Sequence, residues 1–157
     1  MKAPAPFHKL PYEERYKSMG EEAEGEFERR ERNWERFGFN RPDGFELYQI
    51  PKTFQNTPDY MQVHNRGFPR LVEVMGIGSD ETLKIKLNKI TALQWWDASE
   101  LDVWLWVWSS VRQTFADLKF GELMDIINRE ELPVGKFDND TKLFFAIDSS
   151  LLHWNIA

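Results

Sequence analysis

The chain has 157 residues, of which 41% are hydrophobic and 15% aromatic, and this size and composition fit one compact domain over residues 1–157 with a sizeable core. It contains no cysteine, which excludes disulfides, thiolate zinc sites and a cysteine nucleophile, so any metal must be held by oxygen or histidine. The formal net charge of -6 argues against a broad electrostatic grip on nucleic acid, but it leaves room for a local basic groove or a bridging divalent cation.

The N-terminus lacks the apolar segment of a signal peptide. The longest unbroken apolar run, residues 103–108, is too short to cross a bilayer. We therefore expect a soluble, cytoplasmic protein that makes no membrane contact.

Residues 11–37 are dense in Glu and Arg, and their large apolar side chains recur at helical spacings. Phe27, Trp34 and Phe37 are separated by seven and three residues. This pattern predicts one amphipathic helix that ends at Gly38.

Three short runs follow the turn-like sequence NRPDG, and each is rich in β-branched and aromatic residues. Pro, Asn and Gly separate them. We predict three strands, FELYQI (45–50), DYMQV (59–63) and RLVEVMGI (70–77).

Residues 79–99 open with Ser79 and Asp80 as candidate caps, and then place apolar side chains along one helical stripe, at positions 83, 87, 90 and 93. We predict a second helix here. Residues 103–108, VWLWVW, are apolar on both faces, as expected of a covered central strand whose tryptophans belong to the core rather than to a base-stacking surface.

Residues 111–157 form a C-terminal extension to a core of about residues 21–110. The extension contains the helical sequence FGELMDIIN and the strand-like sequence KLFFAI, which the turn DNDT introduces. The predicted fold is thus an α/β single domain of order α-β-β-β-α-β with a helix-strand extension.

This order, with Pro58-Asp59 opening the second strand and Glu73 within the third, resembles the PD-(D/E)xK nuclease superfamily. The chain is similar to the small phage and archaeal Holliday-junction resolvases and the VRR-NUC nucleases, in which a strand of the form hhEhKG precedes a helix that carries a glutamine. Here those features are LVEVMG, residues 71–76, and Gln94. The resemblance implies a restriction-endonuclease-like mixed sheet flanked by helices.

The resemblance implies DNA cleavage with Mg²⁺ or Mn²⁺, which prefer hard oxygen ligands. Asp59 and Glu73 are the candidate ligands, because two carboxylates on neighbouring strands can hold the ion. Glu73 has apolar neighbours in the strand, and a buried glutamate costs stability unless it is paired or metal-bound. The alternative is an edge strand whose solvent face carries Glu73, with Pro58-Asp59 as a plain turn.

In this superfamily a glutamate of the first helix often joins the metal site. At about 100° per residue, Glu24 and Glu31 fall beside the stripe of Phe27 and Trp34, whereas Glu28 falls further round. Glu24 is the candidate that we select, and a solvated charged face is the alternative for this Glu-rich run.

The family pattern places a lysine two residues after the glutamate, but here that position is Met75. Superfamily members also draw this lysine from the adjacent helix. The predicted wheel puts Lys86 and Gln94 on the apolar stripe, with Lys84 and Lys89 pointing away. We expect Lys86 to replace the missing lysine and Gln94 to orient a water or a ligand carboxylate, although a Lys86 that merely snorkels at the helix rim remains the alternative.

The substrate implied by the resemblance is DNA, branched or nicked, and enzymes of this kind often act as homodimers so that two strands are cut together. The main rival follows from Met75: a nuclease-like fold without catalysis, serving as a nucleic-acid-binding or protein-interaction module, for instance in a phage assembly. A small α/β domain with incidental acids is the third reading.

Overall fold

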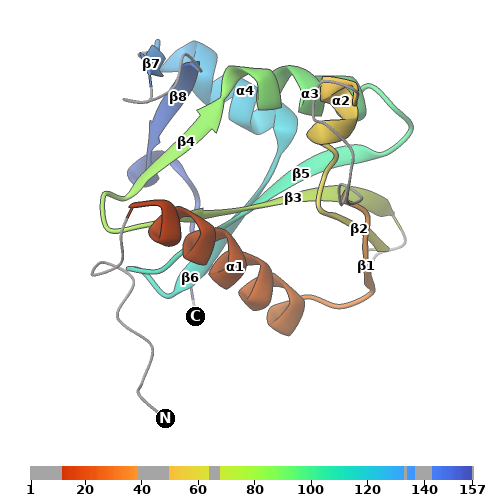
Figure 1. Ribbon diagram of the computed structural model, residues 1–157, viewed down its shortest axis with the longest axis horizontal. Helices are drawn as coiled ribbons and strands as arrows, with labels where there is room; N and C mark the ends of the chain where they lie inside the picture. Colours follow the sequence, from red (N-terminus) through yellow and green to blue (C-terminus); the bar gives the residue numbers. More distant parts are fainter. Residues whose placement is uncertain (1–11, 39–49, 64–67, 133, 137–142, 157) are drawn as a thin grey trace.

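The computed structural model describes residues 12–38, 50–63, 68–132, 134–136 and 143–156 (Figure 1). Helices and strands alternate along much of the chain. In chain order the elements are α1 (Tyr12–Arg30), β1 (Trp34–Arg36), α2 (Lys52–Gln55), β2 (Tyr60–Val63), β3 (Pro69–Ile77), β4 (Thr82–Lys86), α3 (Leu87–Asp97), β5 (Asp102–Ser109), β6 (Thr114–Lys119), α4 (Phe120–Arg129), β7 (Val134–Lys136), β8 (Leu143–Asp148) and a 3₁₀ turn (Ser149–Leu151).

The main sheet has five strands in the order β1-β2-β3-β5-β6, and a smaller sheet has three in the order β4-β8-β7. In the main sheet β3 and β5 are parallel, with Glu73 opposite Leu105, and the other neighbours are antiparallel. Parallel neighbours require a crossover, which β4 and α3 supply. The expected mixed sheet flanked by helices, in one α/β domain, is confirmed.

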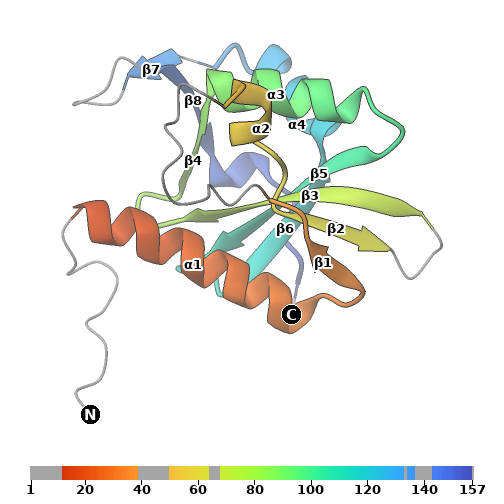
Figure 2. The same ribbon diagram turned by 45° about the vertical axis from the view of Figure 1, so that its right-hand side comes forward.

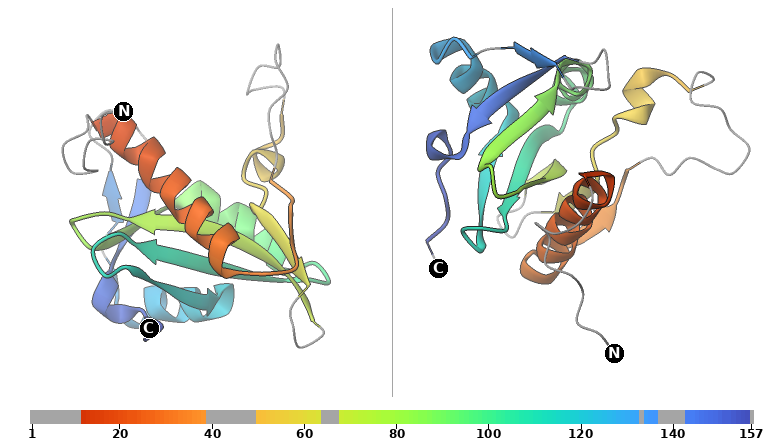
Figure 3. Two further views of the ribbon diagram at one scale, coloured as in Figure 1. Left: turned by 90° about the horizontal axis from the view of Figure 1, so that it is seen from below. Right: turned by 60° about the vertical axis from the view of Figure 1, so that its left-hand side comes forward.

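The main sheet lies between two layers (Figures 1 and 2). The long helix α1 runs diagonally across one face, as the view from below shows, whereas α3, α4 and the smaller sheet lie on the other (Figure 3). None of the helices in the described part of the chain is long and apolar enough to cross a membrane.

Strand alternation divides the buried residues between these two faces. The α1 side holds Phe27, Tyr60, Val72, Trp106 and Trp108. The opposite side holds Leu71, Leu93, Val103, Leu105, Val107 and Leu123. Both faces of β5 are therefore covered, and the prediction that its tryptophans belong to the core is confirmed for Trp106 and Trp108, which are 0% and 1% exposed.

A glycine lets α1 approach the sheet closely. A β-carbon added to Gly76 in β3 would lie 2.7 Å from both Cγ and the carbonyl oxygen of Met19 in α1. One and two turns further along α1, Ala23 and Phe27 are fully buried against the sheet. Gly76 thus sets the distance of the helix that carries Glu24.

The predicted first helix was too long. The helix ends at Arg30, Asn33 adopts a left-handed φ of 57°, and Trp34 begins the edge strand β1. Trp34 packs edge-on against Tyr60 with ring centroids 5.5 Å apart, so pairing with β2 overrides the helical spacing. The strand expected over residues 45–50 lies outside the described residues except for Ile50, which is in a bend.

The single helix predicted over residues 79–99 was wrong in its first half. Thr82–Lys86 is strand β4, paired antiparallel with β8, and α3 begins only at Leu87. Leu83 and Ile85 are buried and Lys84 between them is exposed, which is the period of a strand. Strands β6 and β7 were not predicted, whereas α4 and β8 were.

Candidate functional site

Glu73 lies in the middle of β3 and points to the face covered by α3. It is 1% exposed. The ammonium group of Lys89 donates a hydrogen bond to its Oε1, while its Oε2 is buried and has no hydrogen-bond partner in the described part of the chain. Burial raises the pKa of Glu73, and the charge and hydrogen bond of Lys89 oppose that rise.

Asp59 lies immediately before β2 and is tied to the neighbouring strand. Its Oδ2 accepts a hydrogen bond of 2.8 Å from the backbone N–H of Val74, and its carbonyl oxygen accepts from the N–H groups of Phe37 and Gly38 at 2.9 and 3.0 Å. Burial, and next the negative charge of Glu73, raise the pKa of Asp59 to about 8, against the lowering effect of Lys89. The two acids selected from the sequence therefore lie within electrostatic reach of each other.

The cation at this site is Lys89, whereas the sequence argument selected Lys86 and turned Lys89 away. Lys86 falls on the apolar stripe only when helical steps are counted from Leu83, which belongs to strand β4. Within α3 alone, Lys89 lies one turn before the fully buried Leu93, on the side that faces the sheet. Lys86 is the last residue of β4, opposite Phe144 in β8.

Glu24 is partly buried on α1, and its carboxylate accepts an ion-pair hydrogen bond of 2.9 Å from Arg36. Its negative charge is the last contribution to the raised pKa values of Asp59 and Glu73, and α1 covers the face of the sheet opposite to the one that Glu73 points to. Arg36, which holds Glu24 from β1, was not selected from the sequence because residues 34–36 were assigned to the helix.

Gln94 and Met75, the other two positions of the motif, differ in where they lie relative to Glu73. Gln94 is exposed on α3, and five steps of about 100° place it about 140° around the helix from Lys89. The structure therefore does not bring Gln94 to Glu73. Met75 is on the same face of β3 as Glu73 and is partly buried against the core.

Asp59 and Glu73 are the candidate ligands for a divalent ion. They lie close enough for the charge of Glu73 to raise the pKa of Asp59, and Glu73 Oε2 is a buried acceptor without a donor in the residues that the structure covers. Mg²⁺ in proteins often takes only one or two carboxylates and keeps several waters. Among the described residues no group of three or more His, Cys, Asp or Glu is arranged to hold a metal. The described residues therefore supply two candidate carboxylate ligands and no larger cluster, a number that Mg²⁺ with its waters can accept.

No protein-family model and no curated protein sequence matches the chain. Among solved structures it is similar to D212, a nuclease from a fusellovirus, with a TM-score of 0.42 and 9% sequence identity, over 60% of this chain and 59% of that chain. The chain thus matches about three fifths of the length of that structure. A likeness of this size does not transfer a function, so what the site does must be argued from its own residues.

Proposed function

We propose that the protein is a metal-dependent DNA endonuclease of the PD-(D/E)xK type, similar to the resolvases. The observation that carries the proposal is the buried Glu73 carboxylate, which is bonded to Lys89 on one oxygen, lacks a donor within the described structure on the other, and lies beside Asp59. A glutamate this deep in a core costs stability unless it is paired or metal-bound, and here one of its two oxygens lacks a partner among the described residues.

Asp59 and Glu73 would hold Mg²⁺ or Mn²⁺, and Glu24 would add negative charge from α1. When bound, the ion supplies Lewis-acid polarisation of the phosphate and makes hydroxide available near neutral pH. The hydrogen bond from Val74 N–H fixes one Asp59 oxygen and leaves the other for a ligand. The raised pKa of Asp59 means that a cation and this carboxylate favour each other.

Lys89 takes the role that we expected of Lys86. Its ammonium group holds the Glu73 carboxylate in place and presents positive charge where the phosphodiester would gain negative charge in the transition state. The side chain is 27% exposed, so it reaches solvent and substrate as well as the buried carboxylate. The family lysine would then be supplied by α3 in place of residue Met75.

The proposed substrate is DNA, branched or nicked, and a homodimer would allow two strands to be cut together. The test is cleavage of labelled linear, nicked and four-way-junction DNA with Mg²⁺ or Mn²⁺. We expect Glu73→Gln and Lys89→Met to lose cleavage by about 10²–10³-fold, the loss typical of removing one charge-stabilising group, while Lys86→Met, the matched control, retains it. Full activity in Glu73→Gln, with the protein folded, would refute the proposal.

The second candidate is an inactive nuclease-like module that binds nucleic acid or a protein partner, in a setting such as a phage assembly. The observation that favours it is the direct Lys89–Glu73 ion pair, which already neutralises one candidate ligand, together with Met75 at the family position. Calorimetric titration with Mn²⁺ separates the two candidates. Binding that Glu73→Gln abolishes supports the nuclease, and absence of binding supports the module.

A further inference from the structure

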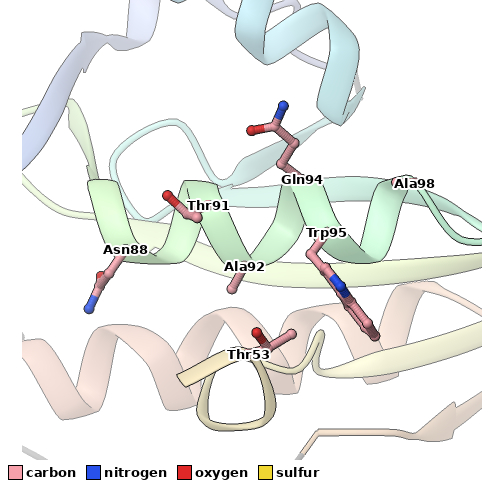
Figure 4. A pocket seen from close by; sticks show the side chains of 7 residues that line it. All are labelled: Thr53, Asn88, Thr91, Ala92, Gln94, Trp95 and Ala98. Carbon is pink, nitrogen blue, oxygen red and sulfur yellow. The ribbon is translucent and has the colours of Figure 1, made fainter. Parts of the chain in front are cut away.

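An open hollow of about 510 Å³ lies between α2 and α3. Its wall on α3 includes Asn88, Ala92 and Trp95, which point toward α2, and Thr53 faces them from α2 (Figure 4). Gln94 points to the other side of the helix in the same view. A hollow of this volume is at the lower end of the range of small-ligand sites, which suits one flat ring system.

Trp95 lines this hollow, and the aromatic side chains of Phe54 and Trp96 lie next to it. Trp95 is 58% exposed and Phe54 is 50% exposed. Both pack edge-on against Trp96, with ring centroids 5.0 and 6.5 Å apart. Trp96 itself donates a hydrogen bond of 3.3 Å from its Nε1 to the carbonyl oxygen of Thr53 and so ties α3 to α2. Trp95 is thus an accessible ring on a braced support, as a stacking platform requires.

The hollow also has an unused polar group. The Oδ1 atom of Asn88 is buried and has no hydrogen-bond partner within the described ranges. A buried acceptor without a donor is unfavourable, and a ligand amino group would satisfy it once the amide turns its oxygen toward the hollow. Asparagine amides recognise the amino and ring-nitrogen edges of nucleobases, adenine in particular.

The hollow adjoins the proposed nuclease site. Asn88 is the sequence neighbour of Lys89, and Trp95 follows two turns along α3, roughly 10 Å away at about 1.5 Å per residue. On the other wall, α2 is followed after a short connection by Asp59. A strand whose phosphate lies at the proposed nuclease site would therefore carry its neighbouring base to the hollow, and this adjacency favours a nucleic acid as the occupant over an unrelated apolar partner.

We propose that this hollow takes one unpaired nucleobase of the DNA substrate, stacked on Trp95 and hydrogen-bonded to Asn88. The inference rests on the proposed function and narrows it to DNA that offers an unpaired nucleotide beside the phosphate to be cut, such as a junction, flap or mismatch. A base inside a continuous duplex is stacked and paired on both sides and cannot enter.

The test measures binding with Ca²⁺ in place of Mg²⁺, using duplexes that contain either one unpaired 2-aminopurine, an abasic position at the same place, or full pairing. We expect 2-aminopurine fluorescence to be quenched on binding. Trp95→Ala should weaken binding of the unpaired-base duplex by roughly ten-fold, the order of loss of one stacking partner. Trp95→Phe should retain most of the affinity, and Phe68→Ala, which removes an aromatic that is 79% exposed outside the hollow, should bind as wild type does.

The outcomes separate this inference from the nuclease proposal. The base site is overturned if Trp95→Ala and wild type bind the unpaired-base duplex with equal affinity. It is also overturned if wild type binds the abasic and base-containing duplexes equally. Either result holds against the base site even where the wild type cuts DNA through Glu73. Quenching that depends on Trp95 supports the base site. If wild type shows this Trp95-dependent quenching but cuts no DNA, the nuclease proposal fails while the base site stands.

Discussion

Replacing Lys89 by methionine should destabilise the protein in a way that depends on pH. The substitution keeps the length of the side chain and removes its charge, so Glu73 is left in the core without its hydrogen-bond donor. Lys89 lowers the pKa of Glu73, and its loss therefore raises that pKa further. The buried carboxyl group must then either remain charged and unpaired or take up a proton.

The size of the effect follows from the burial of the pair. The Glu73 side chain is 2% exposed and that of Lys89 is 27% exposed, so the uncompensated charge would be almost wholly inside. Breaking a buried ion pair from one side costs about 3–5 kcal/mol. At about 2–4 °C per kcal/mol for a chain of this length, the melting temperature at pH 8 should fall by roughly 6–20 °C.

The loss should be smaller at lower pH. Glu73 has a raised pKa in the folded wild type and a higher one still in the variant, so both folded proteins carry more protons on it than the unfolded chain does. Stability of each declines as the pH rises through its own folded pKa. The difference between the two therefore grows with pH between those two values.

The assay is urea unfolding in the presence of a chelator, followed by tryptophan fluorescence, at pH 5 and pH 8. The same substitution is measured in a Glu73→Gln background, where no carboxylate remains to be stranded and the cost should fall below about 1 kcal/mol. An equal cost of Lys89→Met at both pH values, or an equal cost in both backgrounds, would refute the coupling of these two side chains.

Three further predictions concern strand β3 and its neighbours. Met75→Lys returns a cation to the face of β3 that carries Glu73. Lys89→Met alone should lose about 10²–10³-fold of the initial cleavage rate, and the double variant Met75→Lys/Lys89→Met should recover to within about ten-fold of wild type. No recovery would contradict the role assigned to Lys89. Metal-free protein should lose stability as the pH rises from about 4 to about 8, because the pKa of Asp59 in the folded protein, about 8, lies above its ordinary value of 3.8. Mn²⁺ should raise the melting temperature more at pH 8 than at pH 6. A melting temperature of the metal-free protein that does not change with pH would count against this. Gly76→Ala should lower the free energy of unfolding by about 1–3 kcal/mol, because the added β-carbon would lie 2.7 Å from Met19 in α1. Gly121→Ala is the control, since a β-carbon there meets nothing within 4 Å. Equal melting temperatures of the two variants would disprove the close approach.

The class of fold was accessible from the sequence because its strongest signals are local. Residues 103–108 are apolar on both faces, which is typical of a central strand, and β5 is indeed covered on both sides. The charged, amphipathic character of the first helix and the apolar pattern of α4 are periodicities that a single element carries by itself. These elements needed no knowledge of their neighbours.

The boundaries were decided by pairing partners that are distant in the chain. Trp34 fits a helical stripe from Phe27 equally well, but Tyr60 gives it a cross-strand neighbour. Leu83 and Ile85 become strand residues because β8, some sixty residues later, pairs with them. Local spacing cannot distinguish the two states over so few residues.

The candidate site divides in the same way. The sequence by itself determined that Asp59 and Glu73 are acids next to apolar residues and that Met75 stands where the pattern it resembles has a lysine. Only the tertiary structure decided which lysine contacts Glu73. Helix α3 begins at Leu87, so Lys86 lies outside it and Lys89 is on the side of the helix that faces the sheet. The residue at which a helix begins depends on its packing against other elements, which local spacing does not reveal.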